Sequence, residues 1–236
     1  MIRSAKFIEF PAPFDPAPKE YDPAPIFKKQ FTLNRLPQKA ELQAVALGLG
    51  CIYINGKPIT KDVFNTPCGN YLKTLWYHTY EVASLLKEGE NEITVIVGNG
   101  WYNEFLKTGW DFDKAQWRGA PKLLFALDLG SEKLFSDESW VVSREASPVV
   151  YNQLRSGEVY DCRRGEAFLG YGAEGYIPVK LSEDAPSAVL RPCPCQPIRE
   201  FESYTPVATF KNAEGRVVYD FGQNLSGYLN ITLRGK

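Results

Sequence analysis

The sequence lacks several features that would point directly to a compartment or a catalytic class. It has a single histidine, His78, and no run of about 18 apolar residues that could cross a membrane as a helix. Its five cysteines are odd in number and scattered, which argues against a disulfide framework and favours a reducing compartment. The first six residues lack the apolar stretch of a signal peptide. We therefore expect a cytoplasmic protein, or a periplasmic or secreted one if a leader has been removed.

The sequence also lacks an excess of charge and the motifs of common cofactor sites. Lys and Arg number 27 against 28 Asp and Glu, so no basic stripe suits a phosphate backbone, and nucleic acid is not expected as a partner. No phosphate loop or nucleophile elbow is present. Cys193 and Cys195 have one residue between them, and with a single histidine they lack the second half of a zinc site. We expect no bound metal from these residues.

What the sequence does contain is a succession of short strand signals. Apolar residues make up 44% of the chain and charged residues 23%, which is typical of a packed globular domain. Segments rich in aromatic and β-branched residues, or alternating with period two, recur at 27–33, 40–44, 51–59, 75–82, 91–98, 121–129, 140–143 and 149–151. No stretch suits a substantial amphipathic helix, and 83–89 indicates only a helical turn. These patterns predict an all-β antiparallel sandwich or jelly roll with at most one or two short helices.

One turn within this series carries a strong local signal. Asn55 and Gly56 lie between two short apolar runs, and both central residues of a type I′ turn need a positive φ, which these residue types tolerate. The sequence therefore predicts a two-residue β-hairpin at this point.

Proline marks the expected domain boundaries. Six prolines between residues 11 and 25 predict that residues 1–25 form an extended lead-in on the surface. A sandwich is expected over 26–182, followed by a polar linker at 183–197 that contains four prolines. Strand signals at 217–221 and 228–233 predict that residues 198–236 begin a second β-sandwich domain, of which the chain holds only the first strands.

Three segments in order resemble the amino-terminal region of bacterial α-L-rhamnosidases. They are Leu47–Gly50 leading into Tyr53–Lys57, then Thr79–Asn91, then Val97–Tyr102. Residues 137–140 resemble the next strand of that family, and 219–227 resemble the opening of its following β-domain, so the likeness covers roughly residues 26–235. The resemblance implies a galactose-binding-like sandwich that accompanies a helical (α/α) barrel located further along the chain.

The resemblance also implies where the catalytic residues of such an enzyme lie. In that family, the barrel carries the two carboxylates that hydrolyse terminal α-L-rhamnosyl residues with inversion. This chain is then expected to contain no catalytic residue and to be inactive alone. Its expected partners are the catalytic barrel of the same chain and rhamnose-containing glycosides or polysaccharides. A free-standing carbohydrate-binding module and a purely structural spacer remain the alternatives.

The segment 99–118 is the candidate site, because it interleaves aromatic rings with carboxylates and amides. Rings can pack against the C–H faces of a sugar while polar groups bind its hydroxyls. The candidate sugar-binding residues are Trp101, Tyr102, Glu104, Trp110, Asp111, Asp113 and Trp117. The alternative interpretation is that these rings close one end of the sandwich or cover a neighbouring domain.

The carboxylates of this segment have two further interpretations. A catalytic pair is not expected, since solvated or cation-paired carboxylates are common on loops. Related sugar-binding modules include some that use calcium, and Asp111 and Asp113 are possible ligands. Their spacing lacks the further oxygen ligands of an EF-hand loop. We therefore expect no cofactor, with calcium as the alternative.

Overall fold

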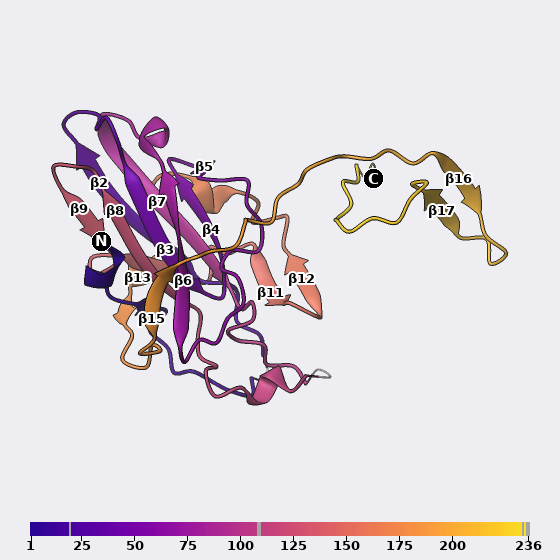
Figure 1. Cartoon of the computed structure of the whole chain (residues 1–236), viewed down its shortest axis with the longest axis horizontal. Helices are drawn as coiled ribbons and strands as arrows, with labels where there is room; N and C mark the ends of the chain where they lie inside the picture. The colour runs from indigo at the N-terminus through magenta and orange to yellow at the C-terminus, as the bar shows by residue number, and fades with distance from the viewer. Residues whose placement is uncertain (19, 108–109, 233, 235–236) are drawn as a thin grey trace. The chain divides into compact units, whose positions relative to one another are not determined.

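The computed structural model describes residues 1–18, 20–107, 110–232 and 234. The chain divides into two compact units, Met1–Pro197 and Ile198–Lys236. The first unit contains two β-sheets and a separate hairpin, and the second contains one short hairpin (Figure 1).

The first unit is a sandwich of a seven-stranded and a six-stranded sheet. The seven-stranded sheet has the order β14 (Lys180–Leu181), β1 (Ile8–Glu9), β8 (Lys122–Asp128), β3 (Glu41–Leu47), β6 (Thr74–Glu81) and β15 (Val189–Pro192), with β9 (Lys133–Phe135) paired to β8. The six-stranded sheet has the order β13 (Ile177–Pro178), β10 (Val141–Ser143), β2 (Ile26–Leu33), β7 (Gly89–Gly98), β4 (Leu49–Ile54) and β5 (Lys57–Pro58). Among the described strands, β6 and β15 form the one parallel pair. The predicted all-β antiparallel sandwich is confirmed.

Successive apolar residues of the central strands point alternately into the space between the sheets and to the outer face. In β8, Leu123, Phe125 and Leu127 belong to the cluster between the two sheets, whereas Leu124 and Ala126 belong to a second cluster on the outer face. Because successive strand residues point to opposite faces, a strand buried on both faces has a continuous apolar run. This is why the segment 122–128 lacks the polar alternation of an exposed strand.

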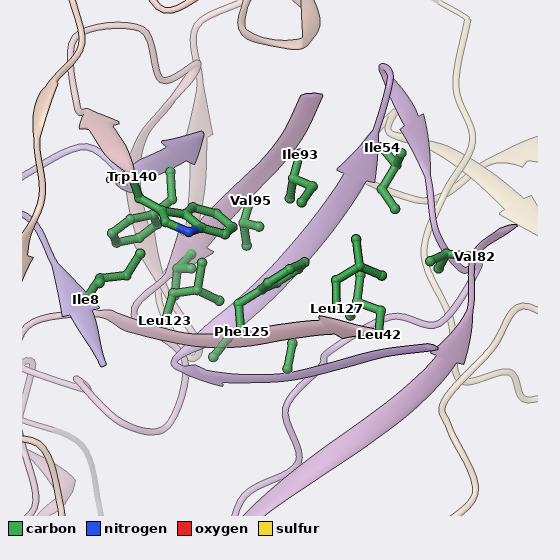
Figure 2. Packing of buried hydrophobic residues seen from close by; sticks show 14 of the residues in the cluster. Ile8, Leu42, Ile54, Val82, Ile93, Val95, Leu123, Phe125, Leu127 and Trp140 are labelled. Atoms are coloured by element: carbon green, nitrogen blue, oxygen red, sulfur yellow. The ribbon is translucent and has the colours of Figure 1, made fainter. Parts of the chain in front are cut away.

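The cluster between the sheets forms the main core. Figure 2 shows Phe125 and Leu123 of one sheet facing Val95 and Ile93 of the other, with Trp140 closing one end. The Trp140 ring lies 5.1 Å from the Phe125 ring, and its indole N–H donates to the carbonyl oxygen of Phe135. Burial of such large rings supplies much of the driving force for folding.

The predicted hairpin between β4 and β5 is confirmed. Asn55 and Gly56 have φ values of 52° and 75°, and Ile54 pairs with Lys57 across the turn. The Asn55 side chain also donates to the carbonyl oxygen of Leu85 and accepts from the backbone N–H of Glu92. The Asn55 side chain therefore links the turn to Leu85 and to β7, on either side of the segment 86–88.

The segments expected as lead-in and linker each add strands to the seven-stranded sheet. Residues 8–9 form β1, which lies between β8 and β14, and Ile8 is fully buried in the core. Residues 189–192 form β15 along the edge of β6. β1 precedes the prolines of its segment, and β15, which contains Pro192, lies at the edge of the sheet, where proline is tolerated. The domain boundaries themselves stay a prediction.

Short 3₁₀ turns and one separate hairpin complete the first unit. The turns are η1 (Ile2–Ser4), η2 (Ala83–Leu85), η3 (Phe112–Lys114) and η4 (Ala167–Leu169). Strands β11 (Val149–Gln153) and β12 (Gly157–Tyr160) form the separate hairpin. Within the described residues, no helix is long and apolar enough to span a membrane.

The second unit contains β16 (Ala208–Lys211) paired with β17 (Val217–Asp220). The strand predicted at 217–221 is therefore confirmed. The strand predicted at 228–233 is wrong for residues 228–232, which have no strand conformation, and residue 233 lies outside the described residues. A strand needs a hydrogen-bonded neighbour, and β16 and β17 pair only with each other in the described part of the chain.

Candidate functional site

The candidate site lies on the loop that connects β7 to β8, which we call the aromatic loop (residues 99–118, described except for 108–109). The loop leaves β7 through Gly100, which has a φ of 51°. A Cβ atom at Gly100 would lie 2.9 Å from the carbonyl carbon of Gly48. Only glycine permits this close approach of two backbones, so the loop begins pressed against the start of β4.

The β11–β12 hairpin holds the first part of the aromatic loop. The backbone N–H of Asn99 donates to Asn152 Oδ1 at 2.6 Å, and Asn99 Nδ2 donates to the carbonyl oxygen of Asn152 at 2.9 Å. The buried Gln153 side chain donates to the carbonyl oxygen of Asn103 and accepts from the N–H of Phe105. Side-chain amides thus take the role that a strand ladder would play for this segment.

Aromatic rings fill the space behind the loop. Tyr71 contacts Tyr102 and Trp117 with ring centroids 5.3 and 5.9 Å apart, and Phe112 lies 5.0 Å from Trp101. Burial raises the pKa of both tyrosines well above the ordinary value, so the hydroxyls stay protonated. The buried rings of Tyr71 and Tyr102 therefore support the partly exposed rings of the loop.

The outer surface of the site is formed by Trp110 and Arg155. The Arg155 guanidinium, from the turn between β11 and β12, lies 3.6 Å from the centre of the Trp110 ring and 5.5 Å from that of Trp101. Trp110 nevertheless remains 64% exposed. A cation over one face of an indole holds the ring in place and leaves the rest of its surface available to a ligand.

The three carboxylates of the loop lie in different surroundings. Glu104 is fully buried, and burial raises the pKa of its carboxyl group, an effect that nearby backbone N–H groups, Arg155 and Arg118 oppose. Asp111 is exposed and accepts a hydrogen bond from Lys114 at 2.9 Å. Asp113 is partly buried, and its backbone carbonyl oxygen accepts from Arg118.

This arrangement suits binding better than bond cleavage. Glycoside hydrolysis needs two carboxyl groups that reach the same glycosidic bond. Glu104 is enclosed, whereas Asp111 is exposed and paired with a lysine. Asp111 accepts from Lys114 through one of its oxygens, and the described residues contain no group of three or more acidic, histidine or cysteine side chains arranged to hold a metal ion. Calcium also takes backbone carbonyl and amide oxygens as ligands, so the calcium alternative stays a prediction.

The structure places the seven candidate residues on one loop, but their side chains differ in burial. Trp101, Trp110, Asp111, Asp113 and Trp117 have exposed or partly exposed side chains, whereas Tyr102 and Glu104 are buried. Sequence reasoning missed Arg155 and Asn152, which lie some 50 residues away in the chain. The only signal for them was the polar segment that ends the strand at 149–153. Binding of sugar by the seven residues stays a prediction.

Comparison with known proteins identifies the sandwich. The family described as the α-L-rhamnosidase N-terminal domain matches residues 35–202. An α-L-rhamnosidase of Formosa agariphila is 28% identical over 230 residues, which cover 90% of this chain and 23% of the relative. An α-L-rhamnosidase of Streptomyces avermitilis is 30% identical over 215 residues, which cover 85% of this chain and 20% of the relative. The chain thus spans about a fifth of the length of these curated relatives.

Solved structures give the same result. The α-L-rhamnosidase of Aspergillus terreus superposes with a TM-score of 0.78 at 28% identity, covering 95% of this chain and 26% of that one. The Streptomyces avermitilis α-L-rhamnosidase, solved with L-rhamnose, superposes with a TM-score of 0.73 at 26% identity, covering 87% of this chain and 20% of that one.

Proposed function

Because the chain belongs to the α-L-rhamnosidase N-terminal domain family, we propose that it forms the non-catalytic front portion of an α-L-rhamnosidase-type glycoside hydrolase. In this role, the sandwich supports a catalytic barrel elsewhere in the same protein, and the aromatic loop binds rhamnose-containing glycosides or polysaccharides. The observation that carries the proposal is the pairing of an exposed indole, Trp110, with a guanidinium on a loop braced by buried rings and amides.

The physical basis of binding is the surface of Trp110. A sugar presents C–H groups on one face of its ring, and these groups pack against an aromatic plane while its hydroxyls bond to polar neighbours. Trp110 offers the plane, and Arg155 and Asp111 offer the nearby donor and acceptor groups. Arg155 also restricts the rotamers of the indole, which lowers the entropy lost on binding.

Calorimetry and fluorescence test the sugar-binding role. Titration of the full chain with L-rhamnose is expected to give weak, saturable heat, with an accompanying change in tryptophan fluorescence. Added calcium is expected to leave both unchanged. Trp110→Ala is expected to remove the fluorescence change, whereas Tyr171→Ala, at an aromatic residue that is 53% exposed outside the loop, keeps it. Absence of heat and of a fluorescence change at millimolar sugar would support the structural-spacer alternative instead.

A hydrolysis assay tests the non-catalytic assignment separately. The purified chain is expected to leave an aryl α-L-rhamnoside intact, because the enclosed Glu104 and the lysine-paired Asp111 are not arranged as acid and base on one bond. Turnover that disappears in the Glu104→Gln variant would contradict this assignment.

A further inference from the structure

Two cysteines lie one residue apart on the segment that follows β15. They are Cys193 and Cys195, and they precede the boundary between the two units at Pro197. Neither belongs to the three apolar clusters of the sandwich. Within the described residues, no further acidic, histidine or cysteine side chain joins them to form a group that could hold a metal ion. Packing and metal binding therefore leave this pair of thiols without a role.

The seven-stranded sheet fixes the position of the first thiol. The backbone N–H of Cys193 donates to the carbonyl oxygen of Tyr77 at 2.9 Å, which extends the parallel pairing of β15 with β6 by one residue. Cys193 is therefore held beside the edge of the sheet, where its side chain is partly exposed. The side chain of Cys195 is exposed. Molecules in solution thus have access to the pair.

The two cysteines are also in contact with each other. The Cys193 Sγ atom lies 4.0 Å from the carbonyl oxygen of Cys195, and its thiol forms a side-chain hydrogen bond with the Cys195 thiol. Pro194 fixes φ between them, and Pro192 and Pro197 restrict the chain on either side. Because these prolines reduce the number of conformations of the segment, little conformational freedom is lost when the two sulfur atoms join.

A disulfide between these residues is sterically possible but strained. Two Cα atoms separated by one residue lie at most about 7 Å apart, and disulfides span about 4.4–6.8 Å between Cα atoms, so closure needs no rearrangement of the sheet. The small ring that results imposes strain. Strained disulfides that are open to solvent are the ones that thiols reduce readily. The pair therefore suits reversible exchange better than permanent cross-linking.

We propose that Cys193 and Cys195 form a reversible thiol–disulfide site that reacts with low-molecular-weight disulfides such as oxidised glutathione. The thiolate of the exposed Cys195 attacks one sulfur of the small disulfide, which gives a mixed disulfide and releases one glutathione thiolate. The thiolate of Cys193 then attacks the Cys195 sulfur, closes the ring and releases the second glutathione thiolate. The protein thiols are oxidised by two electrons, their two protons pass to the released thiolates, and the small disulfide is reduced to two thiols.

Ring formation changes the segment that leads out of the first unit. Oxidation joins two side chains across Pro194, so the backbone between β15 and Pro197 loses freedom that the reduced pair retains. Amide hydrogen exchange in residues 195–199 is therefore expected to slow at least about twofold on oxidation. The inference goes beyond the proposed function and does not rest on it, because neither cysteine belongs to the aromatic loop.

Mass spectrometry of the full chain tests the proposal. The protein is reduced, freed of reductant, incubated with oxidised glutathione at pH 8 and treated with N-ethylmaleimide to trap the remaining thiols. The tryptic peptide 181–199 contains both cysteines and no other, because trypsin does not cleave between Arg191 and Pro192. We expect this peptide to carry neither glutathione nor maleimide and to weigh two hydrogen atoms less than the reduced peptide. Dithiothreitol is expected to restore both thiols.

Single variants separate the two steps. Cys193→Ser leaves the first step intact and is expected to keep glutathione on Cys195, because no second thiol displaces it. Cys195→Ser is expected to form no ring and to leave Cys193 carrying glutathione or maleimide. Cys162→Ser removes an exposed cysteine outside the pair, and as the matched control it is expected to form the ring like the wild type.

Three results would overturn the site. One is a wild-type peptide 181–199 that carries glutathione or maleimide on both cysteines, which would mean that the two sulfur atoms do not join. Another is a disulfide from either cysteine to Cys51, Cys68 or Cys162 in place of the ring. The third is a ring that dithiothreitol does not open in the folded protein, since the exchange would then not be reversible. None of these measurements involves a sugar, so they leave the proposed function to its own tests.

Discussion

At the scale of single residues, two lysines are buried in the sandwich and each contacts a buried carboxylate. Lys28 Nζ lies 2.7 Å from Glu92 and also donates to the carbonyl oxygens of Gly170 and Gly172. Lys122 Nζ lies 2.6 Å from Glu9. A buried ion pair is tolerated when hydrogen bonds satisfy both charges, but loss of one partner leaves the other uncompensated. Lys28 thereby ties the segment 170–172 to the six-stranded sheet.

The first prediction concerns this ion pair. Lys28→Met is expected to lower the free energy of unfolding by about 3–5 kcal/mol, because it leaves the Glu92 carboxylate buried without its cation. Urea denaturation measures the change. Lys39→Ala removes an exposed lysine that lies 3.7 Å from Glu41, and a change within about 0.5 kcal/mol is expected for it. An equal decrease in the free energy of unfolding in the two variants would show that the buried pair contributes no more to stability than the exposed one.

A second prediction concerns the pH dependence caused by Glu104. Burial raises its pKa above the ordinary value of 4.5. The folded chain therefore holds this proton more tightly than the unfolded chain, and the free energy of unfolding decreases as pH rises from 4.5 through the folded pKa. Glu104→Gln removes this contribution, so we expect the variant to gain stability relative to the wild type between pH 4.5 and 7.

Urea midpoints measured across this pH range test the Glu104 prediction. Glu88→Gln, at an exposed carboxylate, is the control and is expected to follow the wild type. A stability difference between Glu104→Gln and the wild type that stays constant with pH would contradict the assigned shift.

At the scale of elements, the β11–β12 hairpin is the part that positions the aromatic loop. It supplies Asn152 and Gln153 to the backbone of the loop, and Arg155 to the Trp110 ring. The sequence patterns predicted β11 but not its role, because hydrogen bonds between residues about 50 positions apart leave no local periodicity. The strands β1 and β15 escaped prediction for a related reason, since each is short and pairs only with distant partners.

The third prediction concerns the hydrogen bonds between the β11–β12 hairpin and the aromatic loop. Asn152→Ala removes the oxygen that accepts from the backbone N–H of Asn99. Because a buried donor is left without a partner, we expect the free energy of unfolding to decrease by about 1–3 kcal/mol. Amide hydrogen exchange in residues 99–105 is expected to accelerate. Asn34→Ala, at an exposed position between β2 and β3, should change neither quantity. Unchanged exchange in Asn152→Ala would mean that the rings alone hold the loop.

At the scale of the whole molecule, the sandwich contains its own complete cores. Every residue of its three apolar clusters lies within the first 190 positions. The second unit, by contrast, exposes large side chains such as Phe201, Val207 and Leu229, which are 86%, 71% and 70% exposed. Large exposed apolar surface of this kind is typical of a segment that packs against another surface.

The fourth prediction follows from this self-contained core. A chain shortened to residues 1–197 is expected to unfold cooperatively in urea, with an unfolding free energy within about 1 kcal/mol of that of the same unit in the full chain. Circular dichroism and tryptophan fluorescence should report coincident transitions. Loss of the cooperative transition on shortening would show that residues 198–236 are required for the sandwich to fold.

The sequence by itself determined the all-β class, the Asn55-Gly56 turn and the family, since these depend on local periodicity, turn chemistry and short ordered segments. It also indicated the aromatic loop as the candidate binding site. Only the tertiary structure decided that Tyr102 and Glu104 face inward and that the Arg155 guanidinium lies over one face of the Trp110 ring. The physical reason is that the period of a strand specifies which residues share a face, whereas the strand or loop that lies opposite them is set by pairing between distant segments.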